Sequence, residues 1–249
     1  MLPFLLVSTR PEDAVAEEEY ETFCRFAGLA PQELHHLRLE QGEDASRALA
    51  ATDLSRYSGV FVGGSPFNTS LPQEQKSATQ VRVELSLGEL LDRVMDHEIP
   101  FFGACYGVGT LGVHQGGVVD STYGEEVGAI SVTVTEDGAR DPLLAELPRE
   151  FFAYVGHKEA IRELPPQAVL LATGVNCPVQ MFRVGPNAYA TQFHPELDAP
   201  ALIRRIEAYK HHGYFLLEEA ESVKQQVHSG PAVEAPAALL RAFVTTFAR

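Results

Sequence analysis

The segment Pro100–Gly107, PFFGACYG, predicts a short buried strand that turns abruptly into a helix. Gly103 and Gly107 stand two places before and after Cys105. Small residues at these places let strand and helix approach closely, and they are typical of a nucleophile on a strained turn. A helix N-terminus there favours the thiolate, because its free N–H groups and the helix dipole stabilise negative charge. The pattern by itself leaves open a second interpretation, a buried apolar cysteine between two packing glycines.

Strand-like and helix-like patterns alternate on the N-terminal side of this segment. Short apolar runs at Leu5–Ser8, Leu37–Leu39 and Gly59–Val62 predict strands. A helix is predicted over Glu12–Ala27, in which the run of three glutamates at positions 17–19 is expected to be a solvated face. Apolar residues spaced by three and four positions predict an amphipathic helix at Val83, Leu87, Leu90, Leu91 and Val94. This alternation indicates a parallel sheet covered by helices on both faces.

The part of the chain that follows, residues 118–192, is richer in short β-type runs separated by Gly, Pro and Asn. These runs predict antiparallel strands at one edge of the parallel sheet: Ile130–Val134, Phe151–Val155, Val169–Ala172, Val179–Val184 and Ala188–Phe193. Further on, Asp198 is a candidate cap for a helix, and two more helices are predicted at Leu216–Val227 and Pro236–Phe247. The expected class is α/β, with a mostly parallel central sheet and antiparallel edge strands.

Composition excludes several classes of function. Asp and Glu number 34 against 19 Lys and Arg, and the net charge of -15 repels phosphate backbones and anionic lipid surfaces. No nucleic-acid or membrane partner is therefore expected. The apolar run Leu2–Val7 is shorter than a secretory core of about 7–15 residues or a spanning helix of about 20. Three cysteines without metal-ligand spacing predict no metal site and a reducing, cytoplasmic location, and the sequence sets no oligomeric state.

Two further segments carry polar groups that complement Cys105. In His194-Pro195-Glu196, residues i and i+2 of an extended segment point to the same side, so the carboxylate can orient the imidazole as a base for the thiol. Taken alone, such a pair is usually the polar end of a strand. The other segment is Gly63-Gly64-Ser65-Pro66, a tight turn after a predicted strand. One of its bare backbone N–H groups, together with that of Tyr106, is a candidate oxyanion hole, and the pattern by itself leaves open an ordinary strand-to-loop turn.

Together these three segments resemble the class I glutamine amidotransferases, particularly the stand-alone group similar to the amidotransferase part of GMP synthase. The resemblance rests on the segments 61–66, 100–107 and 191–196, and it extends over about residues 1–212. It implies a flavodoxin-like fold in which Cys105 attacks a γ-carboxamide, His194 relays the proton and Glu196 orients His194. It also implies that Gly64 and Tyr106 supply the oxyanion donors. The reaction would pass through a glutamyl thioester and would need no metal or organic cofactor.

The chain departs from the family pattern next to the nucleophile. Family members usually carry Gly-His-Gln there, and Gly109 stands where the Gln would be. The contact to a substrate glutamine must then come from elsewhere, or the substrate is a different γ-glutamyl amide. Other residues expected beside the substrate are Ser65, which follows the glycine turn, and His157, in a region where the family often has a His-containing turn.

Residues 213–249 lie beyond the amidotransferase core and are expected to form a helical extension packed on the same domain. The chain contains no Ser-Gly-Gly-x-Asp-Ser motif for ATP pyrophosphatase chemistry, so either an ammonia acceptor is bound by a separate synthase subunit or the enzyme simply hydrolyses its amide. Two alternatives to a glutaminase remain. One is a γ-glutamyl peptide or γ-glutamyl-amine hydrolase with the same triad, and the other is a non-catalytic regulatory or binding subunit.

Overall fold

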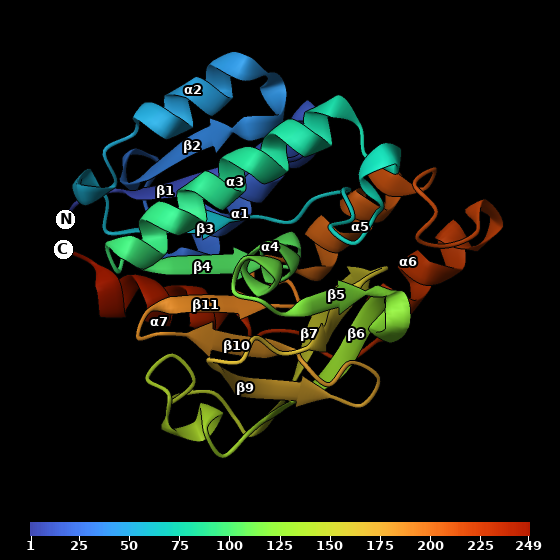
Figure 1. Cartoon of the computed structure of the whole chain (residues 1–249). Helices are drawn as coiled ribbons and strands as arrows, with labels where there is room; N and C mark the ends of the chain where they lie inside the picture. Colours follow the sequence, from blue (N-terminus) through green and yellow to red (C-terminus); the bar gives the residue numbers. More distant parts are fainter.

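A nine-stranded sheet runs through the molecule in the order β2-β1-β3-β4-β11-β10-β9-β6-β7 (Figure 1). The computed structural model describes all residues, 1–249. Five strands are mutually parallel: β1 (Phe4–Ser8), β2 (Leu34–Arg38), β3 (Gly59–Val62), β4 (Phe101–Ala104) and β11 (Ala188–Thr191). Four strands extend the sheet in antiparallel fashion: β10 (Met181–Val184), β9 (Ala168–Gly174), β6 (Glu125–Val134) and β7 (Glu150–His157). The predicted α/β class with a mixed sheet is confirmed.

One of the expected antiparallel edge strands occupies a different place. The segment Ala188–Phe193 forms β11 only to Thr191, and β11 pairs in parallel with β4 while pairing antiparallel with β10. It therefore lies at the boundary of the two halves of the sheet. The hairpin with β10 turns at Gly185, whose φ of 59° suits glycine. Because β4 and β11 run in the same direction, the residues that follow them emerge side by side.

Helices cover both faces of the sheet. One face carries α1 (Asp13–Ala27) and α7 (Ala237–Phe247), and the other carries α2 (Glu43–Ala51), α3 (Ala78–Asp96) and α4 (Tyr106–His114). Near β6 and β7, α5 (Ala199–Tyr209) and α6 (Ala220–Ser229) pack into a third, smaller apolar cluster (Figure 1). The predicted cap of α5 is present, since Asp198 Oδ1 accepts a hydrogen bond from the Ala201 N–H at 2.9 Å. None of the helices combines the length and apolar character needed to cross a membrane.

Several boundaries differ from those expected. The strand expected at Leu37–Leu39 begins at Leu34 and ends at Arg38, because its two histidines interrupt the apolar pattern on a partly exposed edge strand. The helix expected from Leu216 begins at Ala220, after a short 3-10 turn. Sequence patterns also missed α2 and the small antiparallel sheet of β5 (Val118–Asp120) and β8 (Ala160–Glu163). Helix α2 has nine residues of which only Leu49 is buried, and β5 and β8 have three and four residues, so each pattern is too brief to stand out in the sequence.

The C-terminal helix α7 completes the larger core. Its Leu239, Leu240 and Phe243 are fully buried. The ring of Phe243 lies 5.2 Å from that of Phe61 on β3 and 5.5 Å from that of Phe102 on β4. This helix therefore packs under the same strands that lead to the glycine turn and the cysteine turn.

Candidate active site

The three predicted segments meet at the carboxyl ends of three adjacent parallel strands. The Gly63-Gly64 turn follows β3, Cys105 follows β4, and the His194–Glu196 segment follows β11. Ala104 is paired with Thr191 across the two central strands, and the Cys105 N–H donates to the Thr191 carbonyl at 2.7 Å. Ligand sites in open parallel sheets occupy this edge.

Cys105 is held on a strained turn. Cys105 has a φ of 52° and a ψ of -88°, and it is one of the two non-glycine residues of the chain with a positive φ. It directly precedes the first turn of α4. Packing requires a glycine at position 103, because a Cβ on Gly103 would lie 2.8 Å from Gly107 Cα, whereas a Cβ on Gly107 would make only ordinary contact with Val62 at 3.5 Å. Strand and helix thus pass too close for a side chain at position 103, as expected for a nucleophile on a turn at a helix N-terminus. The side chain is half-buried and lines a cavity.

His194 and Glu196 form a buried pair beside it. The imidazole Nδ1 lies 2.7 Å from Glu196 Oε1, and the carboxylate is fully buried. A carboxylate at this distance assigns the proton to Nδ1, which leaves Nε2 for a second partner. The loop is anchored by the His194 N–H, which donates to the Tyr154 carbonyl of β7 at 2.9 Å.

The charges of this pair shift both of its pKa values. Burial alone would lower the pKa of His194, but the Glu196 carboxylate and the neighbouring Cys105 outweigh it and raise that pKa to about 9. Burial would likewise raise the pKa of Glu196, but the His194 imidazolium and the charge of Arg205 lower it to about 2. At neutral pH the pair is therefore an imidazolium and a carboxylate.

Two backbone N–H groups are free at the predicted oxyanion positions. Tyr106 is the first residue of α4, and the N–H groups of a helix's first turn have no partner within the helix. On the other side, a Cβ on Gly64 would lie 3.0 Å from His194 Cε1, so this turn sits against the imidazole. The Gly64 carbonyl accepts a hydrogen bond from Thr9 Oγ1 at 3.3 Å, which fixes the orientation of the turn.

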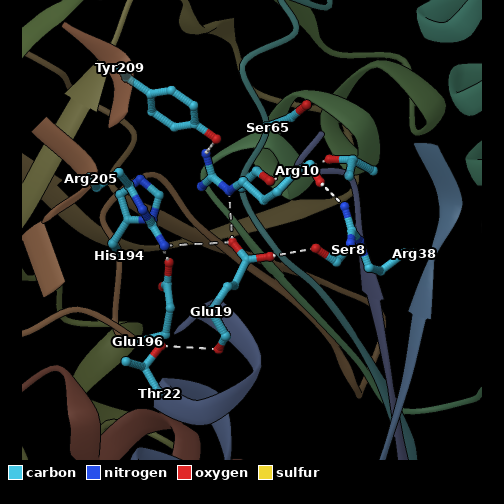
Figure 2. Close-up of polar contacts among 12 residues, drawn as sticks. Ser8, Arg10, Glu19, Thr22, Arg38, Ser65, His194, Glu196, Arg205 and Tyr209 are labelled. Carbon is cyan, nitrogen blue, oxygen red and sulfur yellow. Dashed lines mark hydrogen bonds and ion pairs between the residues drawn. The ribbon is translucent and has the colours of Figure 1, made fainter. Parts of the chain in front are cut away.

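A network of buried charges lies beneath these groups and was not foreseen from the sequence (Figure 2). Arg205 of α5 donates to Glu196 Oε1 at 3.3 Å, and its other terminal nitrogen lies 3.8 Å from Glu19 Oε1. Glu19 also accepts from Arg10 Nε at 3.0 Å and from the Ser8 hydroxyl at 2.9 Å. Its complete burial corrects the expectation that the glutamates of α1 form a solvated face. Glu19 follows Val15 by four residues and precedes Phe23 by four, so it lies on the buried face of the helix.

The remaining predicted residues line the cavities around Cys105. Ser65 is buried and faces both of the cavities that include Cys105, while Gly109 and His157 line the second of them. A Cβ on Gly109 would lie 2.8 Å from Thr69 Oγ1, and Glu159 Oε1 is 3.7 Å from it. Those two side chains therefore occupy the space in which a longer residue at position 109 would lie.

Tyr214 lines both of these cavities and was not identified from the sequence. Burial and the nearby Cys105 raise its pKa to about 12. Lys158 holds this segment in place: its Nζ donates to the His212 carbonyl at 2.6 Å and lies 4.7 Å from the Tyr214 ring centre. The volumes of the two cavities are about 40 and 20 Å³.

One cluster has the residue types of a metal site. Atoms of Glu125, His157 and Cys177 lie within 4.8 Å of one another. The polar atoms of this cluster already have protein partners, since His157 Nε2 lies 2.9 Å from Glu125 Oε2 and its Nδ1 lies 3.0 Å from the Glu159 carbonyl. Burial raises the pKa of the Cys177 thiol to about 12, which disfavours the thiolate that a metal needs.

Comparison with known proteins gives consistent results. Residues 37–201 match the family described as glutamine amidotransferase class-I. Over 121 residues the chain is 33% identical to a GMP synthase [glutamine-hydrolyzing] subunit from Thermoplasma volcanium, a match covering 48% of this chain and 58% of that protein. It is 29% identical over 155 residues to GMP synthase [glutamine-hydrolyzing] of Xylella fastidiosa, covering 59% of this chain but 27% of that protein. The matches thus span little more than half, or about a quarter, of these relatives.

Solved structures share the fold across the whole chain. A glutamine amidotransferase from Thermotoga maritima superposes with a TM-score of 0.71 at 23% identity, covering 99% of this chain and 98% of that one. A glutamine amido transferase from Methylobacillus flagellatus gives a TM-score of 0.69 at 13% identity, covering 100% and 96%. Both coverages include the C-terminal helices that lie outside the family match.

Proposed function

The chain belongs to the class-I glutamine amidotransferase family, and on that premise we propose that it hydrolyses the side-chain amide of glutamine through Cys105, His194 and Glu196. The observation that carries the proposal is the meeting of a cysteine on a strained helix-start turn with a buried imidazole–carboxylate pair. The relatives named GMP synthase [glutamine-hydrolyzing] support glutamine as the substrate.

The mechanism follows from the charges of the site. The Cys105 thiolate adds to the amide carbonyl, and the oxyanion that forms accepts the N–H groups of Gly64 and Tyr106. His194 Nε2 then gives its proton to the departing nitrogen, so ammonia leaves and a glutamyl thioester remains. Water attacks the thioester while His194 removes one of its protons, and glutamate and the thiolate are regenerated. Glu196 keeps the imidazole oriented and stabilises its charged form throughout.

The ammonia goes to an acceptor on another protein in this proposal. The Thermoplasma volcanium relative is named as a subunit of GMP synthase, and a subunit is one part of a larger assembly. We assign residues 1–212 to the amidotransferase domain and residues 213–249 to a helical extension on the same domain. Tyr214, the second residue of that extension, lines both cavities that include Cys105, so a partner that displaces this segment would enlarge them.

A second candidate function is hydrolysis of a γ-glutamyl peptide or γ-glutamyl amine by the same triad. It is favoured by Gly109, because Thr69 and Glu159 fill the space of the glutamine-contacting side chain usual in the family. The cavity next to His194, where the leaving group would lie, is lined mainly by apolar side chains such as Val127, Leu197 and Ile206. An apolar amine suits that lining better than ammonia does.

One experiment separates these candidates. The purified chain is incubated with glutamine and, in parallel, with γ-glutamyl dipeptides and γ-glutamyl amines, and glutamate release is measured with Cys105→Ala as the control. A larger kcat/KM for glutamine supports the first candidate, and a larger value for a substituted amide supports the second. Release that persists unchanged in Cys105→Ala would overturn both. Absence of release from all substrates, with Cys105 unreactive toward an electrophilic glutamine analogue, would indicate a non-catalytic protein.

A further inference from the structure

Glu19 stands at the centre of the buried network and outside the triad. It lies on α1, and its carboxylate is reached by groups from three other places in the fold. Ser8 closes β1, Arg10 lies in the loop between β1 and α1, and Arg205 projects from α5 (Figure 2). Arg10 in turn donates to the Tyr209 hydroxyl at 3.2 Å. Two hydrogen bonds, from the Ser8 hydroxyl and Arg10 Nε, fix the position of this buried carboxylate, and Arg205 lies 3.8 Å from it as an ion-pair partner.

The network contains two arginines and two glutamates, and its formal charges balance. Arg10, Glu19, Glu196 and Arg205 are each at most 6% exposed. Charges buried to this degree are tolerated only when they are paired. Glu19 is therefore a second negative charge beside Arg205, in addition to Glu196, and it offsets part of the positive charge that Arg205 brings to the triad. Arg205 lies close to the His194–Glu196 pair, with one terminal nitrogen 3.3 Å from Glu196 Oε1 and 3.4 Å from His194 Nδ1.

The same carboxylate lies under the oxyanion turn. A Cβ on Gly63 would overlap the carboxylate of Glu19, and a Cβ on Gly64 would overlap the guanidinium of Arg10. The two glycines are thus in direct contact with the Glu19–Arg10 ion pair. This contact supplies a packing reason for both glycines, in addition to their bare N–H groups.

From this geometry we propose that Glu19 is a positioning residue of the site. Its carboxylate holds Arg205 against Glu196 and holds Arg10 beneath the Gly63-Gly64 turn. One side chain of α1 thereby sets both the charge around His194 and the position of an oxyanion donor. The proposal rests on the proposed function, because it assigns a role within that triad.

The sign of the expected effect follows from the groups that face His194. They are Cys105 from the start of α4, Glu196 from the same loop, Arg205 and Tyr209 from α5, Arg10 from the β1–α1 loop, and Tyr214 from the segment above. Removing the negative charge of Glu19 leaves two arginines against one glutamate. The net positive charge that remains favours the loss of a proton from neighbouring groups, so the Cys105–His194 pair should lose its protons at lower pH. The pH profile of the pair must move to lower pH.

The test is the rate at which iodoacetamide alkylates Cys105 as a function of pH, measured by mass spectrometry of the Cys105 peptide so that the other two cysteines do not interfere. We expect Glu19→Gln to shift the profile down by about one pH unit. Glu19→Asp keeps the charge and should restore much of the wild-type profile. Glu17→Gln is the matched control, the same substitution at an exposed position of the same helix, and should leave the profile unchanged.

A second variant keeps the test decisive if Glu19→Gln does not fold. Arg205→Gln removes a positive charge next to His194, so it should shift the profile to higher pH, opposite to Glu19→Gln. A merely structural role predicts no such pair of opposite shifts. A folded Glu19→Gln or Arg205→Gln with the wild-type profile would overturn the proposal. Alkylation needs no substrate, so glutamate release measured on the same samples tests the proposed function separately.

Discussion

The substitution Gly64→Ala tests the oxyanion turn directly. A methyl group on Gly64 would overlap the Arg10 guanidinium and lie 3.0 Å from His194 Cε1. Arg10 has no room to move aside, because it is 3% exposed and is bonded to both Glu19 and Tyr209. The turn must shift instead, and a displacement of about 1 Å at a catalytic group costs about 10²-fold in rate. Losing an oxyanion donor outright costs about 10²–10³ in kcat, or roughly 2.7–4 kcal/mol.

We therefore expect Gly64→Ala to lower kcat for glutamine hydrolysis by about 10²–10³ with a small change in KM. Steady-state glutamate release is the assay, and Cys105 alkylation checks that the nucleophile is intact. Gly88→Ala is the matched control, since a Cβ on this helical glycine meets no atom within 4 Å. It should keep wild-type activity and gain about 0.5–1 kcal/mol of stability. A Gly64→Ala enzyme with the kcat of the wild type would refute the assignment of Gly64.

Three further predictions concern the charged pair and the core. Glu196→Gln removes the main group that raises the pKa of His194 to about 9, so the alkaline limit of kcat/KM should move to lower pH, and an unmoved limit would contradict the pairing. The raised pKa of His194 contributes stability that is complete below its reference value of 6.5 and is lost as pH rises through about 9. The lowered pKa of Glu196 contributes stability that is complete above its reference value of 4.5 and is lost as pH falls toward about 2. Urea unfolding should therefore show the destabilisation by Glu196→Gln to be greatest between those two reference values and smaller at either extreme, whereas a pH-independent difference would argue against the ion pair. Phe243→Ala on α7 should lower the free energy of unfolding by about 3–5 kcal/mol, and the same change at Phe152, which is 43% exposed, should cost far less.

The sequence predicts the elements that carry strong local patterns. The strand and turn around Cys105, the His194–Glu196 segment and the glycine turn each have a signature within eight residues, and parallel strands bring such segments to one edge. The order of the strands is less accessible, and the position of β11 beside β4 was missed for that reason. Its parallel partner is more than eighty residues away, and a short strand has the same pattern in either direction.

The buried network shows a different limit of sequence reasoning. Glu19, Arg10 and Arg205 are charged residues whose partners lie on other elements, so each one by itself is typical of a surface. A signal for Glu19 exists in its spacing from Val15 and Phe23, which places a carboxylate on the apolar face of α1. A charge in that position needs a buried counter-charge. Sequence alone does not say that the counter-charges are Arg10 and Arg205, because that depends on how α1 and α5 meet.

Glutamate release from glutamine by wild-type protein and by Cys105→Ala is the most direct test of the central claim. We expect release that requires Cys105, together with accumulation of a glutamyl thioester on that residue when the reaction is quenched with acid. The variant should keep the wild-type circular dichroism spectrum, because Cys105 is half-buried and forms no disulfide. Equal release by the two proteins would contradict the proposed nucleophile and with it the whole mechanism.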